Sequence, residues 1–388
     1  MHRRNDSVIL LPLLISIAAC GDTSSALPGG DEIIVEDAVL ESEDELSGCN
    51  VDVLPEKEMV ITHPGVVEDP ARTTGKGAWT FARLMENLAG GQDARKFVLT
   101  WLETWKTPQI LDRFVIPHRP KMSELVIEPW KARSGNEGLD LEKAPFRLLA
   151  ITNRVDLAEA NGQAGEGRII FGVVDKDGGA LPFTVIFEYK LLSRGGMRAQ
   201  EWARQWHALS DLPLGSPEYN AKLQALTDKF TTASALAQLR TNEIALEKPW
   251  ELREFHLRNG RLAPAAMELT PDLSFNGTQV LAKFIDRNRN KIDGETHAVR
   301  SRFQGDPYQA ASALAPNPSF QWDAPGVAPE LRLKFSRSTC NGCHTGDTGT
   351  TFLHIAPRQQ GQPAQLSNFL ANVDIPRRVT NMKKLLCR

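Results

Sequence analysis

The 388-residue chain has a mass of 42.9 kDa and is 41% hydrophobic and 24% charged, which is ordinary for a globular protein. This composition excludes the collagen-like, fully disordered and multi-span membrane classes, and the length suits two domains or one large domain with appendages. The formal net charge of -3 gives no sign of a nucleic-acid-binding protein. The five cysteines are too few for a disulfide-based scaffold, so a hydrophobic core must stabilise the fold.

The first twenty residues have the anatomy of a secretory signal. A basic start is followed by an apolar run over residues 8–17, and the run leads into Ile17-Ala18-Ala19-Cys20. This last segment resembles the lipobox of bacterial lipoproteins. The resemblance implies that residues 1–19 are a lipoprotein signal peptide and that Cys20 is acylated and anchors the protein in the cell envelope. Gly21 favours the outer membrane, on its periplasmic or surface face, and the alternative is an ordinary signal that ends beside a cysteine.

A strongly acidic segment follows the signal. Residues 21–56 hold eleven acidic residues and no lysine or arginine, which predicts a disordered acidic tether over residues 20–58. Residues 57–388 carry 43 basic and 36 acidic residues, a net charge of +7. This surplus is either a solvated surface or a docking face for an acidic redox partner. Basic residues gather near the C-terminus at Arg377, Arg378, Lys383, Lys384 and Arg388.

Residues 59–328 show the pattern of an α+β domain, in which an antiparallel sheet is flanked by helices. Apolar residues at helical spacing alternate along the chain with β-branched and aromatic runs that end at Gly and Asn turns. We expect helices over 80–88, 94–105 and 199–240, strands over 145–157, 165–174, 181–192, 238–245 and 250–269, and hairpin turns at Asp177-Gly178-Gly179 and Asn259-Gly260.

Two weak motifs are rejected. Asp286, Asn288 and Asn290 match the start of a calcium loop, but Lys291 replaces the turn glycine and the helical spacing of apolar residues continues through the segment. Gly75-Lys76 lacks the upstream glycine and the strand of a phosphate loop. GxSxG, HExxH and GxGxxG do not occur in the sequence, so no catalytic residue is assigned.

The sharpest motif is Cys340-Asn341-Gly342-Cys343-His344. This CxxCH pattern resembles the haem-attachment motif of c-type cytochromes. The resemblance implies that Cys340 and Cys343 bind haem c covalently and that His344 is the proximal iron ligand. Residues 329–388 then form a mostly helical and loop segment that binds haem and packs on the body, with electron transfer as the function. Export agrees with this interpretation, because haem is attached outside the cytoplasm.

The distal iron ligand has two candidates. Met382 stands in the usual order of His then Met, and His354 follows His344 after ten residues, a stretch long enough to round a porphyrin edge. An iron with an open distal position would permit peroxide or small-ligand chemistry. Two other interpretations stay open for a lipid-anchored surface or binding protein. Cys340 and Cys343 form a disulfide, or they form a structural zinc site together with His344 and His354.

Cys49 and Cys387 are the two cysteines that remain. An even remainder in an exported protein predicts a disulfide between them, which would hold the C-terminus near the start of the body. Long-loop closure of this kind stabilises a fold by a few kcal/mol in the chain-entropy model.

Three segments are similar to those of a family of uncharacterised bacterial exported lipoproteins. The segments are NRVDL at 153–157, GEGRIIFGVV at 165–174 and STCNGCHTGDTGTTFLHIAPR at 338–358. The similarity extends over most of residues 75–388 and implies one continuous unit that ends in the CxxCH segment. It implies no activity, so the functional expectation depends on the motif.

Overall fold

The structure is a computed structural model. The expected signal peptide, the acylation site Cys20 and most of the expected tether lie outside the described residues. Within the described part, no helix is both long enough and apolar enough to cross a membrane. The structure describes residue 49 and residues 51–135, 138–158, 163–192 and 198–388.

Some of the described residues before residue 59, the boundary expected from the charge pattern, belong to the folded body. Val53 is buried, and helix α1 spans Pro55–Glu58. The fully buried Glu58 accepts a hydrogen bond from the backbone N–H of Leu54 at 2.7 Å, and its other oxygen lies 2.9 Å from Nδ1 of His207. The last acidic residues of the expected tether are therefore held in place by contacts with the rest of the protein.

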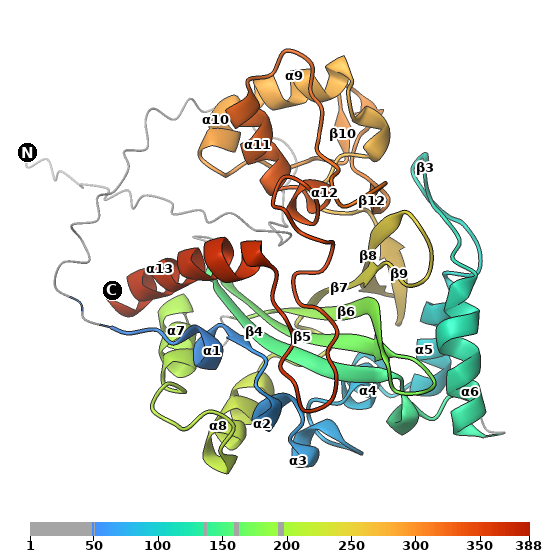
Figure 1. Ribbon diagram of the computed structural model, residues 1–388, viewed down its shortest axis with the longest axis vertical. Coiled ribbons are helices and arrows are strands. Elements are labelled where there is room, and N and C mark those ends of the chain that lie inside the picture. Colours follow the sequence, from blue (N-terminus) through green and yellow to red (C-terminus); the bar gives the residue numbers. More distant parts are fainter. Residues whose placement is uncertain (1–48, 50, 136–137, 159–162, 193–197) are drawn as a thin grey trace, which may run out of the picture.

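An eight-stranded antiparallel sheet is the centre of the molecule and confirms the α+β class (Figure 1). The strand pairs follow the hairpin order expected from the sequence, with Asn259 and Gly260 in left-handed conformation at the turn between β8 and β9. The strands are β1 (Val60–Ile61), β4 (Phe146–Ala158), β5 (Ala164–Val174), β6 (Ala180–Lys190), β7 (Leu236–Glu243), β8 (Trp250–Arg258) and β12 (Ala313–Ala315), with β9 (Arg261–Ala265) also paired to β8.

One face of this sheet is apolar and packs against helices. The ring of Phe81, in α4, lies 5.9 Å from that of Phe171 in β5 and 6.0 Å from that of Phe187 in β6. Trp101, in α5, packs edge-on against Phe255 of β8 at 5.9 Å. The expected helix pair is confirmed, since Gly90 ends α4 in left-handed conformation. The helices of this part are α2 (Pro64–Val67), α3 (Pro70–Thr73), α4 (Phe81–Ala89), α5 (Ala94–Glu103), α6 (Glu128–Ser134), α7 (Ala199–His207) and α8 (Pro217–Thr227).

The prediction of helical structure over residues 199–240 is only partly correct, because this range contains two helices and the start of a strand. The helical part divides into α7 and α8, because the loop between them contains Pro213 and the left-handed Gly215, and Pro217 begins the second helix. The last part of the expected helix is already strand β7, which begins at Leu236.

The opposite face of the sheet is also covered, here by the C-terminal part of the chain (Figure 1). Because side chains alternate along a strand, the residues between the apolar ones point to this face. Arg168, Glu188 and Arg240 lie there and are at most 8% exposed. The cover consists of residues 344–369, a π-helical turn (Leu370–Asp374) and α13 (Ile375–Leu386). The charged face of the sheet is therefore an internal surface.

A second apolar cluster lies beside the sheet and contains the CxxCH turn. It joins Trp250 of β8 to Phe284, Phe335, Cys340 and Cys343. The cluster includes residues on both sides of the boundary expected at residue 329, while α13 returns to the main core. The rejected calcium segment is helical, as expected. The elements are α9 (Gln279–Arg287), α10 (Arg289–Asp293), β10 (Arg302–Phe303), β11 (Asp306–Pro307), α11 (Pro329–Arg337) and α12 (Cys340–Cys343), and a separate hairpin pairs β2 (Gln109–Leu111) with β3 (Phe114–Ile116).

The expected disulfide is present between Cys49 and Cys387, whose Cα atoms are 5.7 Å apart. It closes a separation of 338 residues and ties the end of α13 to the first described residue. The bridge therefore fixes one end of the helix that covers the charged face of the sheet.

Candidate functional site

The CNGCH motif forms one short helical turn, α12, and both cysteines are buried. Thr339 caps the turn, since its Oγ1 accepts a hydrogen bond from the N–H of Gly342 at 3.3 Å. Cys340 and Cys343 are one turn apart and are not joined in a disulfide. A Cβ atom at Gly342 would lie 2.3 Å from the carbonyl oxygen of Ser336, so the packing requires glycine at this position of the motif.

His344 follows the turn and is held in a defined tautomer. Its Nδ1 lies 2.6 Å from the carbonyl oxygen of Phe352, an acceptor, so Nδ1 carries the proton and Nε2 keeps its lone pair. Asn242 donates to the same carbonyl at 3.0 Å and accepts a hydrogen bond from the indole N–H of Trp250 at 2.6 Å. The Trp250 ring stacks on His344 with centroids 5.2 Å apart. Burial lowers the pKa of His344 to about 4, so the imidazole is neutral at pH 7.

His354 is brought next to His344, with ring centroids 4.4 Å apart. Its Nε2 lies 3.3 Å from Sγ of Cys343, and its Nδ1 lies 2.9 Å from Oγ of Ser367. Burial holds its pKa well below the usual range. Iron between two imidazoles needs centroids about 6 Å apart, since each metal–nitrogen bond is about 2 Å long. His354 would therefore have to swing away from His344 before it could act as the distal ligand.

Met382, the other candidate for the distal position, lies in the main core. It is fully buried in α13, where its Sδ is 3.7 Å from Nδ2 of Asn153 on β4. The cavity beside His344 is lined by Asp374 and Arg378 of the same helical region and not by Met382. The structure thus places His354, and not Met382, beside His344.

The cavity beside the two histidines lies between the charged face of the sheet and its C-terminal cover. Its volume of about 80 Å³ corresponds to a few water molecules at about 30 Å³ each, and is too small for a porphyrin in this arrangement. Its walls mix apolar side chains with buried charges. The lining includes Ile170, Ile186, Arg168, Glu188, Arg240, Asn242, His344, His354, Ile355, Phe369, Asp374 and Arg378.

The buried charges of the wall form a connected network across β5, β6, β7 and β8. Arg168 pairs with Glu166 at 2.7 Å and with Glu188 at 3.5 Å, and Arg240 pairs with Glu188 at 3.1 Å and with Glu254 at 2.8 Å. Sequence reasoning missed all of these residues. Their alternation with apolar neighbours was visible in the sequence, but the same pattern fits a strand that faces water.

A second ion-pair group lies where α13 meets the sheet. Asp374 pairs with Arg378 and, at 2.7 Å, with Arg377, and the positive charges of Arg378, Arg154 and Arg377 hold its pKa far below the usual range despite burial. Arg377 and Arg378, two of the basic residues that were expected on a solvated surface or a docking face, are therefore engaged with the protein itself. Arg378 is also buried.

The four residues of the zinc interpretation do not form a metal-binding group in the described part of the chain. No three of Cys340, Cys343, His344 and His354 bring their ligand atoms within 4.8 Å of one another. The two thiols suit thioether bonds to a haem, and the neutral imidazole of His344 suits binding of its iron. The cavity, however, would have to widen to admit the porphyrin ring.

The chain matches no protein-family model, and comparisons with curated proteins and with solved structures also give no match.

Proposed function

We propose that the protein is an exported, lipid-anchored c-type cytochrome that carries one haem for electron transfer. Cys340 and Cys343 would hold the porphyrin through thioethers, and Nε2 of His344 would bind the iron. The observation that carries the proposal is the tautomer of His344. Its Nδ1 proton is directed to the carbonyl oxygen of Phe352 at 2.6 Å, which leaves Nε2 as the electron-pair donor of a neutral ring.

When bound, the haem supplies one-electron redox chemistry at its iron. The chain positions the ligand that controls this chemistry. Phe352 fixes the proton on His344, while Trp250 stacks on the imidazole ring and limits its rotation. Arg168, Arg240 and Arg378 line the cavity wall, and each is paired with a buried carboxylate of the protein, so the carboxylates of a haem would have to compete for these cations.

Attachment requires the cover over the cavity to move. The ring of His354 occupies the space next to His344, and its segment is held by the contact between Nδ1 and Ser367. We infer that residues 353–369 shift outward when the ring enters. His354 and Met382 remain the two candidates for the distal position, and an open position would favour peroxide or another small ligand.

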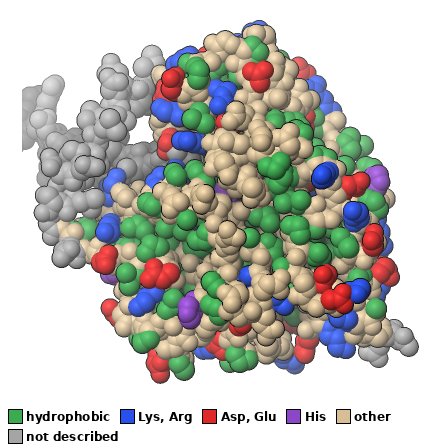
Figure 2. All heavy atoms as spheres, viewed as in Figure 1, with side chains coloured by type: hydrophobic (Ala, Val, Ile, Leu, Met, Phe, Trp, Pro, Cys, Tyr) green, Lys and Arg blue, Asp and Glu red, His purple; other side chains and the backbone are tan. Residues whose placement is uncertain are grey.

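The proposed location is the cell envelope, with Cys20 as the lipid anchor to the outer membrane. The proposed redox partner is acidic and would approach the positively charged residues near the C-terminus. Lys383 and Lys384 are half-buried and Arg388 is exposed. On the face shown in Figure 2, charges of both signs are interspersed, so a partner on this side would meet local positive groups and no uniform field.

Expression of the full chain with its signal peptide, in a host with haem-attachment machinery, tests the proposal. We expect red protein whose haem survives a denaturing gel, and loss of the covalent haem in Cys340→Ala and Cys343→Ala. His344→Ala should keep the thioethers but change the Soret band and the reduction potential. Cys387→Ser is a matched control, because it removes a cysteine outside the motif. Colourless wild-type protein from a host that matures other c-type cytochromes would overturn the proposal.

A second candidate function is reversible dithiol–disulfide exchange at Cys340 and Cys343. The observation that favours it is the 3.3 Å contact between Sγ of Cys343 and Nε2 of His354, which places an imidazole nitrogen beside a thiol. Oxidation would join the two sulfur atoms, release two protons and pass two electrons to a thiol-oxidising partner. Colourless protein in which both thiols react with a maleimide, and lose this reactivity on mild oxidation, would favour this candidate over haem attachment.

A further inference from the structure

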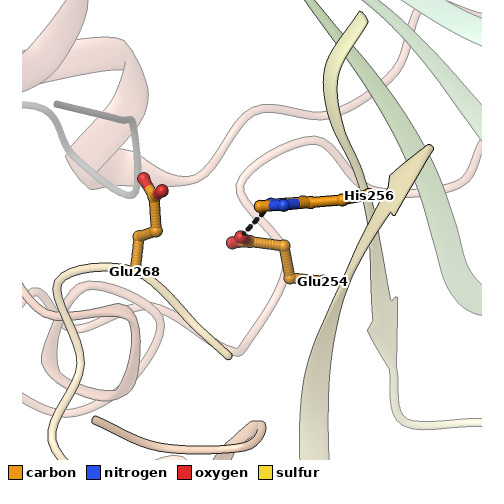
Figure 3. Close-up of side chains that lie close together, drawn as sticks. All are labelled: Glu254, His256 and Glu268. Carbon is orange, nitrogen blue, oxygen red and sulfur yellow. Dashed lines mark hydrogen bonds and ion pairs between the residues drawn. The ribbon is translucent and has the colours of Figure 1, made fainter. Parts of the chain in front are cut away.

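A cluster of three potential metal ligands lies at strand β8 and the segment after β9, outside the cavity described above (Figure 3). Glu254 and His256 project from the same face of β8, and Glu268 lies on the segment that follows β9. Their ligand atoms are all within 4.8 Å of one another, and they form the sole group of this kind among the described residues. A tetrahedral site needs about 3.3 Å between ligand atoms, so a small movement of the side chains completes it.

The charges of the cluster are incompletely balanced. Both oxygens of the fully buried Glu254 are used, one by Arg240 at 2.8 Å and the other by Nε2 of His256 at 2.8 Å. In contrast, Oε2 of Glu268 is buried and has no hydrogen-bond partner. Burial raises the pKa of Glu268 to about 7, and no cation among the described residues opposes this shift. A buried acceptor without a partner is costly, and a bound cation would remove that cost.

We propose that Glu254, His256 and Glu268 bind one divalent transition-metal ion of the zinc class. Two carboxylates and one imidazole are ligands that Zn²⁺ accepts, and three protein ligands leave a position for water. The imidazole selects against Ca²⁺, which prefers a shell of oxygen ligands. On binding, His256 places its proton on Nδ1 and gives Nε2 to the metal. The exposed Arg258, whose Nη2 lies 3.4 Å from Nδ1, moves away.

The site is physically connected to the CxxCH turn. The carbonyl oxygen of Glu268 accepts a weak hydrogen bond from Sγ of Cys340 at 3.9 Å, and Oγ1 of Thr270 accepts one from the N–H of Cys340 at 2.9 Å. An ion held by Glu268 would therefore fix the segment against which the first cysteine packs. Metal binding does not depend on haem, so it can be measured in protein that has neither thiol of the motif.

The test uses the full chain with Cys340→Ala and Cys343→Ala, which removes thiol ligands and covalent haem. Calorimetry with Zn²⁺ should give one site per chain, with Mn²⁺ and Ca²⁺ binding more weakly in that order. Glu268→Gln and His256→Gln should each lower the Zn²⁺ affinity by at least about tenfold. His207→Gln is the matched control, because it removes the other close histidine–glutamate pair, and Glu295→Gln removes a half-buried carboxylate elsewhere. Both controls should bind Zn²⁺ as the parent does.

Thermal unfolding separates a ligand role from a merely structural one. Zn²⁺ should raise the Tm of the parent and leave that of Glu268→Gln unchanged. Without metal, Glu268→Gln should unfold at the same temperature as the parent or higher, because it removes an unpaired buried carboxylate. Absence of a Zn²⁺ site, unchanged affinity in both ligand variants, or Ca²⁺ binding as tight as Zn²⁺ would overturn the proposal.

Discussion

The Nδ1 atom of His344 lies 2.6 Å from the carbonyl oxygen of Phe352, and this contact leaves Nε2 as the ligand atom of a neutral imidazole. The pair lies within a small buried network. Asn242 donates to the same carbonyl at 3.0 Å and accepts from Trp250 at 2.6 Å. The position of the ring is thus set by a strand residue about 100 positions earlier in the chain.

Asn242→Ala should destabilise the fold by about 1–3 kcal/mol, because it leaves the indole N–H of Trp250 buried without an acceptor. Urea denaturation measures the change. Asn87→Ala is the matched control. Asn87 is half-buried and its side-chain amide donates a hydrogen bond to the carbonyl oxygen of Thr231 at 2.9 Å, so its loss should cost about 1 kcal/mol or less. An Asn242→Ala variant within 0.5 kcal/mol of wild type would contradict a supporting role for this network.

Much of the fold could be predicted from local sequence. The period-two runs identified strands β4, β5 and β6, and the Asn259-Gly260 pair identified the turn of the β8–β9 hairpin. A helix cap such as Gly90 interacts only with the last turn of its own helix, so it can be recognised from the local sequence.

The site was predictable only in part. The CxxCH motif is local, whereas the cover over the charged face of the sheet comes from residues far along the chain. Charged residues at alternate strand positions normally face water, so Arg168 and Glu188 gave no warning that α13 and the segment before it bury them. The Glu254–His256–Glu268 cluster likewise depends on a turn that brings Glu268 back to β8.

Stability should depend on pH through buried histidines. Burial lowers the pKa of His297 to about 4, whereas its unfolded value is near 6.5. Between these values the unfolded chain binds a proton that the folded chain does not, so this group makes stability fall as pH drops from 6.5 towards 4. The slope is about 1.4 kcal/mol per pH unit. Glu243, whose pKa burial raises to about 7, acts in the opposite direction, so the effect is best seen as a difference between variants.

His297→Gln should remove that slope. The stability difference between wild type and His297→Gln should shrink by about 1.4 kcal/mol for each unit from pH 6.5 to 4, in urea titrations at four pH values. Ser338→Ala is the control. It removes the 3.1 Å contact to Nε2 of His297 but keeps the imidazole buried, so its difference from wild type should stay nearly constant. A pH-independent difference for His297→Gln would show that this residue does not titrate differently on unfolding.

The Cys49–Cys387 disulfide should contribute about 2–4 kcal/mol, because it closes a separation of 338 residues in the unfolded chain. Replacement of both cysteines by serine should lower the urea midpoint accordingly. A reducing agent should lower the midpoint of wild type and leave that of the double variant unchanged. Equal sensitivity of both proteins to the reducing agent would assign the effect to another pair of cysteines.

Arg240 should be among the residues least tolerant of substitution, because it neutralises two buried carboxylates at once. It pairs with Glu188 at 3.1 Å and with Glu254 at 2.8 Å, and all three side chains are at most 2% exposed. Arg240→Met leaves Glu254 without a guanidinium partner and Glu188 with only its 3.5 Å contact to Arg168, and it should cost about 3–5 kcal/mol in urea denaturation. Arg289→Met, which breaks the exposed pair with Asp286, should cost about 0.5 kcal/mol or less.

Charge removal should rescue the Arg240 variant. Adding Glu188→Gln and Glu254→Gln to Arg240→Met removes the two negative charges that lost this arginine, so the triple variant should recover at least half of the lost stability. A destabilisation of less than about 1 kcal/mol for Arg240→Met would mean that water or another cation reaches these carboxylates. A triple variant no more stable than Arg240→Met would assign the loss to packing of the arginine side chain instead of its charge.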